Sequence, residues 1–99
     1  MKAYRQGDVV IRVGVTVPKD AKPLAHRILA HGEVTGHKHQ VAVGDATLYE
    51  HDGQLFLRVE SETATITHEE HGPVTLPQGD FGIVIQREYT PDGWANVQD

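Results

Sequence analysis

The sequence contains no cysteine, and only one methionine and one tryptophan stand among its 99 residues. The lack of cysteine excludes disulfides, thiolate metal sites and cysteine nucleophiles together. No apolar run reaches the length of a membrane span, so we expect no membrane association. The polar start of the chain carries no apolar stretch of signal-peptide length and predicts a cytoplasmic protein.

Basic residues are also scarce, with nine Lys and Arg against fourteen Asp and Glu, which gives a formal charge of -5. This balance excludes the electrostatic footprint of a nucleic-acid-binding protein. Hydrophobic residues make up 38% and charged residues 23%, the composition of a globular rather than a disordered chain. The length predicts one domain over residues 1–99.

Hydrophobic residues alternate with a period of two along most of the chain, and no segment repeats the i, i+3, i+4 spacing of a helix. Residues 18–23 (PKDAKP) read as a surface connection, and Asp52-Gly53 predicts a tight hairpin. The pattern predicts an all-β fold, a single small β-barrel or sandwich of about seven to eight short strands. We expect these strands at residues 8–17, 27–34, 39–43, 46–50, 54–60, 63–68, 80–89 and 94–97.

Seven histidines are the most unusual feature of the composition. His37 and His39 are two residues apart, so a strand places both imidazoles on one face of the sheet. In that register they share the face with Val41 and Val43, which predicts that both histidines point inward where the apolar row leaves the core.

A second histidine motif, THEEH, ends the expected 63–68 strand. Alternation places His68 inward and Glu70 on the same side, whereas Glu69 faces away if the strand continues. His71 joins His68 only if the chain leaves the strand through a bulge or a single helical turn.

Inward histidines near the mouth of a barrel, together with a carboxylate, suit a divalent transition metal such as zinc, nickel or iron. No organic cofactor is indicated. An open coordination position would allow a metal-bound water of lowered pKa, and the spacing leaves both a catalytic and a structural site open. The candidate ligands are His37, His39, His68 and His71, with Glu70 as a ligand or general base.

Two other functions fit the same residues. One is a metal-free module that forms a homo-oligomer or docks a protein partner through its edge strands, with the histidines as hydrogen-bonded structural residues. The other is a pH switch that acts through histidine protonation. His26, His31 and His51 have no partner at ligand spacing and are expected on the surface.

Four motifs together resemble a family of small uncharacterised bacterial proteins. They are QGDV at residues 6–9, GEVTGHKH at residues 32–39, THEEH at residues 67–71 and QREY at residues 86–89. The resemblance spans nearly the whole chain and implies that the two histidine motifs act as a linked pair, but it brings no activity.

Two weaker likenesses concern known barrels. The order of His37, His39 and His68 is similar to that of the ligands of cupins, small β-barrels, and implies a bound metal. Residues 8–13 and the Gly-Glu-Val and Val-Gly-Asp turns resemble the co-chaperonin barrel, which implies an interaction module as a remote variant. Residues 18–23 stand where that barrel has its Gly-rich mobile loop.

Overall fold

The computed structural model describes residues 3–32, 36–90 and 93–96, and within them the predicted all-β fold is confirmed. No helix capable of crossing a membrane occurs in this part of the chain. A hairpin of β9 (Arg87–Thr90) and β10 (Gly93–Asn96) forms a separate two-stranded sheet. The main sheet has eight antiparallel strands: β1 (Ala3–Gln6), β2 (Val9–Arg12), β3 (Lys22–Pro23), β4 (Ile28–His31), β5 (Lys38–Val43), β6 (Ala46–His51), β7 (Gln54–Thr67) and β8 (Val74–Ile85).

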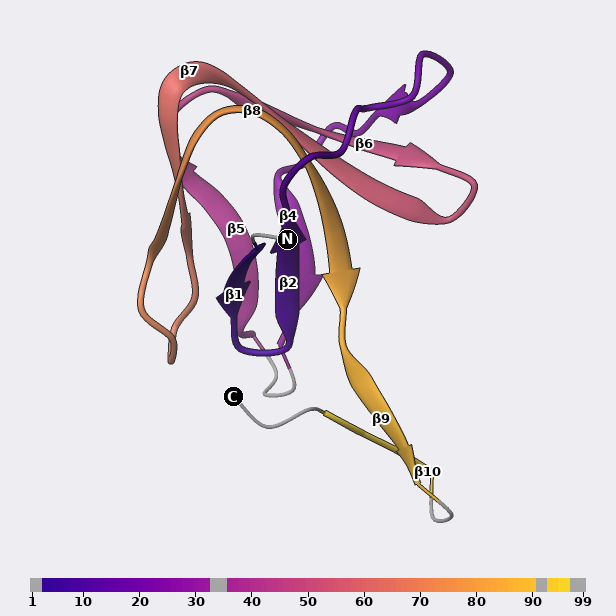
Figure 1. Ribbon diagram of the computed structural model, residues 1–99. Coiled ribbons are helices and arrows are strands. Elements are labelled where there is room, and N and C mark those ends of the chain that lie inside the picture. Colours follow the sequence, from indigo (N-terminus) through magenta and orange to yellow (C-terminus); the bar gives the residue numbers. More distant parts are fainter. Residues whose placement is uncertain (1–2, 33–35, 91–92, 97–99) are drawn as a thin grey trace.

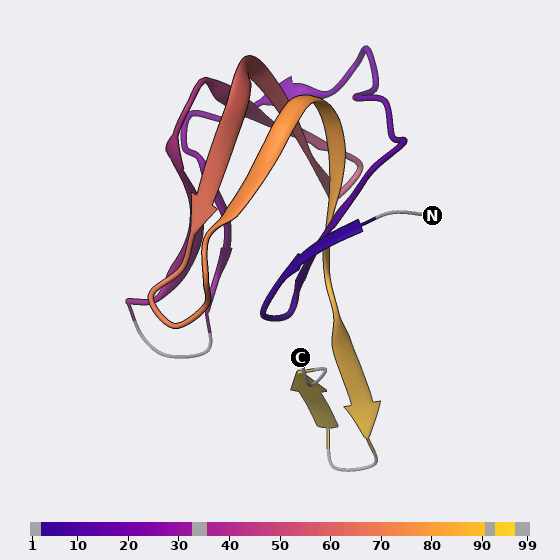
Figure 2. The same cartoon turned by 60° about the vertical axis from the view of Figure 1, so that its left-hand side comes forward.

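The main sheet is strongly curled around the long strands β7 and β8. Its order is β1-β2-β8-β7-β5-β4, while β6 pairs with β7 and β3 pairs with β6. In two views 60° apart, β7 and β8 arch over the fold (Figures 1 and 2), so that both halves of the sheet share them. Within the described ranges no backbone pairing joins β1 to β4, and the sheet is therefore barrel-like without being closed.

The arch of β7 comes from an irregularity in its middle. Residues 54–60 and 63–68, expected as two strands, are the two halves of this one strand, which pair with β6 and β5 respectively. The register against β8 shifts between Val59 and Thr63, where two backbone amides of β7 donate to the carbonyl oxygen of Asp45. The prediction of two strands was wrong because a bulge bends a strand without ending it.

The strand expected at residues 8–17 ends much earlier, at Arg12. Gly14 has a φ of 81°, a left-handed conformation that interrupts the extended chain. Beyond it, the amide of Val17 donates to Oδ2 of Asp80 at 3.0 Å instead of to a neighbouring strand. The alternation of valines therefore continues beyond the residues that pair with a neighbouring strand. For this reason the pattern predicted a longer strand than the one observed.

Other strands also differ from expectation. The strand expected at 80–89 begins earlier, as β8, and breaks after Ile85 into β9. Phe81 and Ile83 in β8 are buried, whereas Ile85 at its end is 37% exposed. β1 and β3 were not predicted because each is too short to show a period. Residues 33–35 and 97, the ends of two expected strands, lie outside the described residues.

The predicted hairpin between β6 and β7 is confirmed. His51 pairs with Gln54, and the two residues between them have positive φ, 51° at Asp52 and 80° at Gly53. Such a pair of left-handed residues matches the twist of the flanking strands, and Asp-Gly is a favoured sequence for it.

The core lies inside the curl of the sheet. Ile11, Leu48, Leu57, Ile66 and Leu76, from four different strands, have no exposed surface. The period-two argument for β5 holds at its start, where His39 and Val41 are buried, but fails at Val43, which is 63% exposed. The reason is a register shift against β7 between Val41 and Val43, because a bulge reverses the face of every later side chain.

Candidate metal centre

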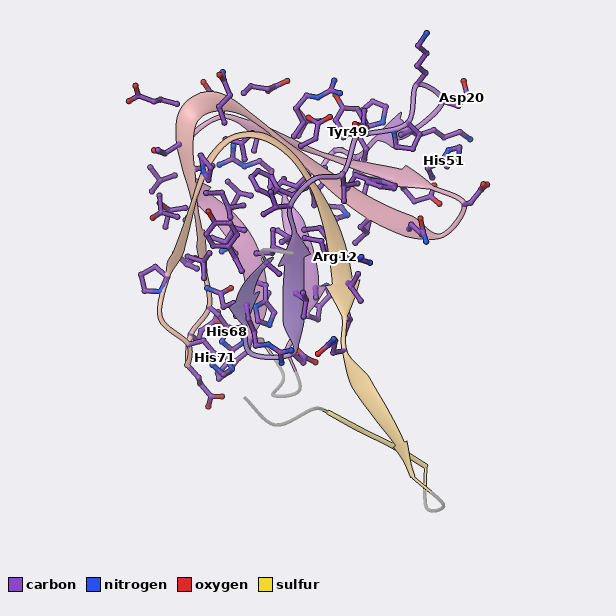
Figure 3. The ribbon with its side chains drawn as sticks, viewed as in Figure 1. Arg12, Asp20, Tyr49, His51, His68 and His71 are labelled. Carbon is purple, nitrogen blue, oxygen red and sulfur yellow. The ribbon has the colours of Figure 1, made fainter. Side chains whose placement is uncertain are left out.

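Four of the predicted ligands meet at one end of the curled sheet and form what we call the histidine cluster: His37, His39, His68 and His71. The ring centroids of His39 and His68 are 4.2 Å apart in a stacked arrangement, those of His68 and His71 are 4.9 Å apart, and those of His37 and His68 are 5.6 Å apart. Figure 3 shows His68 and His71 beside the turn between β1 and β2, at the end of the fold away from His51.

One polar atom of the cluster, on the ring of His37, has no hydrogen-bond partner in the protein. Its Nδ1 is buried and makes no hydrogen bond, and the nearest carboxylate oxygen, Oε1 of Glu70, lies 3.8 Å away. One donor atom each from His37, His68 and Glu69 lies within 4.8 Å of the other two. A buried polar atom without a partner is costly, so this group is arranged to receive something that bonds to it.

Glu69 enters this group because β7 ends at Thr67, before the second histidine motif. If the strand continued, Glu69 would face away from His68. Instead the backbone amide of Lys38 donates to Oε1 of Glu69 at 2.9 Å, and this bond lowers the pKa of the Glu69 carboxyl. Glu70 lies close to His37 as well, so the turn brings both carboxylates to the histidine cluster.

The same turn fixes the tautomer of His68. The backbone amide of Glu70 donates to Nδ1 of His68 at 3.0 Å, so the neutral ring carries its proton on Nε2. Coordination of a metal by either nitrogen displaces this hydrogen bond, at a cost of about 1 kcal/mol.

His39 has the opposite tautomer, with its proton on Nδ1, and the contact with Gln6 is the reason. Nδ1 of His39 lies 2.9 Å from Oε1 of Gln6. The orientation of the Gln6 amide is set because its Nε2 donates to two backbone carbonyls, that of Ile66 at 3.0 Å and that of Gly72 at 2.9 Å. Oε1 of Gln6 must therefore accept, Nδ1 of His39 carries the proton, and Nε2 of His39 keeps its lone pair.

The pKa of His39 is lowered from 6.5 to about 4. Burial is the largest cause, since the residue is only 1% exposed, and the neighbouring His68 adds to it, while Asp8 acts in the opposite direction. His39 is therefore neutral at pH 7, the form in which imidazole binds a metal.

Sequence reasoning missed the contribution of the turn between β1 and β2. Gln6, Gly7 and Asp8 all lie against the histidine cluster. Gln6 binds His39 Nδ1, and Oδ1 of Asp8 lies 3.7 Å from His39 Nε2. The signal available in the sequence was the pair of polar residues Gln6 and Asp8 on either side of Gly7, shortly before the apolar strand that begins at Val9.

Gly7 leaves the space that His71 occupies. A Cβ at this position would stand 2.7 Å from Nε2 of His71, and the φ of 61° already disfavours any side chain. We expect Gly7→Ala to lower the free energy of unfolding by about 2 kcal/mol, measured by urea denaturation. The control is Gly53→Ala, with a φ of 80° and no atom within 4 Å, which should lose about 1 kcal/mol. Equal losses would show that His71 gives way freely.

The remaining histidines lie outside the cluster. His26 and His31 are exposed, and Nδ1 of His26 accepts a hydrogen bond from the amide of Ile28. Nε2 of His51 lies 3.4 Å from Oδ2 of Asp52 at the far end of the fold (Figure 3).

The fold and the site define a small all-β protein with a histidine and carboxylate cluster at one end of a curled antiparallel sheet. The chain belongs to the family described as "Domain of unknown function (DUF8820)", which matches residues 5–86. That range contains both histidine motifs and the turn between β1 and β2. No curated protein and no solved structure matches the chain. The likenesses to cupins and to the co-chaperonin barrel stay predictions.

Proposed function

We propose that this protein binds a divalent transition metal at the histidine cluster, with His37, His68 and Glu69 as ligands and Glu70 beside them. The observation that carries the proposal is the buried Nδ1 of His37, which has no hydrogen-bond partner. A donor atom of the same residue also lies within 4.8 Å of donor atoms of His68 and Glu69. A bound ion would satisfy Nδ1 of His37.

The donor set favours zinc, nickel or iron. It offers imidazole and carboxylate groups without sulfur, since the chain has no cysteine, and these ligands suit such metals. Glu69 lies on the outside of the cluster, where the amide of Lys38 holds its exposed carboxylate beside the donor atoms of His37 and His68. The rings of His39 and His71 lie next to the ring of His68 and add further imidazole nitrogens to the cluster.

The test is elemental analysis of tag-free protein purified without a nickel column, combined with a thermal melt with and without a chelator. We expect near-stoichiometric metal in the wild type and a higher Tm with metal, because a ligand that binds only the native state stabilises it by about 2.7 kcal/mol at 100 times Kd. The double variant His37→Ala, His68→Ala should lose at least tenfold in affinity.

The matched control is His26→Ala, His51→Ala, which removes two histidines outside the cluster and should leave the metal content and the difference in Tm with and without chelator unchanged. A wild type that takes up no metal and melts identically with and without chelator would refute the proposal. That result would favour the metal-free interaction or oligomerisation module, and oligomeric state would be measured next.

A further inference from the structure

An apolar groove of about 430 Å³ lies beside the end of β8. Leu55, Ile83, Val84 and Ile85 contribute apolar surface to it, and Arg12 is the only charged residue among the described residues that line it. Figure 3 shows Arg12 next to β8. A volume of this size is typical of binding pockets. The described lining includes no residue of the histidine cluster, so the groove is a separate feature of the molecule.

The end of β8 is also an open strand edge on the side of the groove. On its other side, Val84 and Ile85 both pair with β2. The pairing with β7 reaches only to Ile83, and no strand of the described residues continues it along the last two residues of β8. Val84 and Ile85 are 38% and 37% exposed. An exposed edge that carries apolar side chains is a template for pairing with another segment.

The C-terminal hairpin of β9 and β10 lies outside the main sheet. Within the described ranges it makes no backbone pairing with any other strand, and in both ribbon views it extends away from the curl (Figures 1 and 2). The family match ends at residue 86, directly before this hairpin. A two-stranded hairpin by itself is at best marginally stable in water. The hairpin therefore needs a surface on which to pack.

Gln86 directs the hairpin away from the groove of its own chain. The backbone amide of Gln86 donates to the carbonyl oxygen of Asp8 at 2.8 Å, and its Oε1 accepts a hydrogen bond from Nη2 of Arg5. These contacts hold the junction between β8 and β9 against the first two strands. A reversal of the chain at Gln86 would break both hydrogen bonds, whereas a second copy can bring its groove to the hairpin without breaking either.

The charges of the hairpin segment and the groove are complementary. Residues 87–99 contain three acidic residues and one basic residue, a net charge of -2. The groove carries the guanidinium of Arg12, although the whole chain has a net charge of -5. Opposite charges favour this encounter over contact between two acidic surfaces, and they help to fix the register of the partners.

We propose that the hairpin of β9 and β10 docks into this groove on a second copy of the chain, and that exchange of the two hairpins forms a twofold dimer. Mutual exchange uses the same two surfaces on both copies, which closes the assembly at two chains. The added hairpin would cover the open edge of β8 and the apolar surface beside it.

The aromatic residues of the hairpin suit this role. The sequence places Tyr89 in β9 and its only tryptophan, Trp94, in β10, and the backbone register sets the two residues opposite each other. Aromatic residues bury about 150–250 Å² each, so two exchanged hairpins would bury roughly 800 Å² of aromatic surface. The groove walls that they cover would contribute a similar area. The total matches the roughly 1,600 Å² of a standard stable interface.

The test is sedimentation equilibrium of the full chain with a chelator present, combined with the fluorescence emission of Trp94. We expect a monomer–dimer equilibrium, with emission that shifts to the blue as the dimer forms because the indole leaves water. Val84→Lys should weaken the dimer at least about tenfold, since it places a charge in an apolar contact. The matched control is Val43→Lys, the same substitution at a 63% exposed valine of β5, which should keep the wild-type dissociation constant.

A mixture of two variants tests the exchange itself. Val84→Lys alters the groove and keeps the hairpin, whereas Trp94→Ala alters the hairpin and keeps the groove. Each variant alone has no intact contact, but their heterodimer regains one hairpin in one groove. We expect the mixture to associate more tightly than either variant. Because Trp94→Ala contains no tryptophan, a blue shift on mixing reports only on the hairpin of the Val84→Lys chain.

The results separate the possible occupants of the groove. A monomer at every concentration would overturn the proposal: blue-shifted emission would then place the hairpin on its own chain, and unshifted emission would leave the groove to another ligand. A dimer that Val84→Lys leaves intact, or that both lysine variants weaken equally, would also overturn it. The emission of the unaltered chain decides the question even if Val84→Lys unfolds. None of these results bears on the proposed metal centre, which uses other residues.

Discussion

Replacing Gln6 with methionine is expected to lower the free energy of unfolding by about 3 kcal/mol, equivalent to a fall in Tm of roughly 12–24 °C. The side chain is 3% exposed and makes three hydrogen bonds, to His39 and to the carbonyls of Ile66 and Gly72. Methionine has a similar length, so the loss comes mainly from polar groups left unpaired in the interior. Urea denaturation of chelator-treated protein measures it.

The same variant should loosen the turn between β7 and β8, because Gln6 binds the carbonyls on either side of the second histidine motif. Hydrogen exchange in that turn should therefore accelerate. The control is Gln78→Met, which removes one exposed hydrogen bond to the carbonyl of Glu60 and should change stability by less than about 1 kcal/mol. Similar losses in the two variants would contradict the role assigned to Gln6.

Acidification of the metal-free protein from pH 7 to pH 4 is expected to remove about 3 kcal/mol of stability through His39 alone. Its pKa in the folded protein is about 4, against an ordinary value of 6.5. Between pH 4 and pH 6.5, His39 is protonated in the unfolded chain but neutral in the folded protein. Unfolding therefore takes up a proton, and lower pH favours unfolding. The contribution is fully present above about pH 6.5 and is lost as the pH falls through 4.

The measurement is the free energy of unfolding against pH with a chelator present. His39→Gln should flatten the curve between pH 6.5 and 4, whatever its stability at pH 7, because the titrating group is gone. His26→Gln, at an exposed position, should keep the wild-type slope. A His39→Gln curve as steep as that of the wild type would assign the acid sensitivity to other groups.

Particular residues show how far the sequence predicts the site. Alternation correctly buried His39, Val41 and Ile66, whereas His37 precedes β5, which begins at Lys38. The same rule misplaced Val43 and Glu69. A register shift lies next to Val43, and the strand ends before Glu69 is reached. Period-two reasoning holds only while a strand stays in register, and bulges have no period.

The partners of the histidine cluster could not be predicted, because they depend on strand pairing between distant segments. Gln6 meets His39 only because β1 folds back on β2 and the sheet curls until its turn reaches the ends of β5 and β7. A sequence shows the chemical character of Gln6 and Asp8, but not which of many polar residues will face a given ring.

The sequence by itself determined an all-β chain without thiol chemistry and with two histidine motifs, because composition and side-chain period are local properties. The tertiary structure decided which nitrogen of each histidine is available, why the pKa of His39 is low and which carboxylates stand beside the rings. Those properties arise from burial and from contacts between residues up to 66 positions apart, such as Gln6 and Gly72. The curl of the sheet brings them together, and no local pattern encodes that geometry.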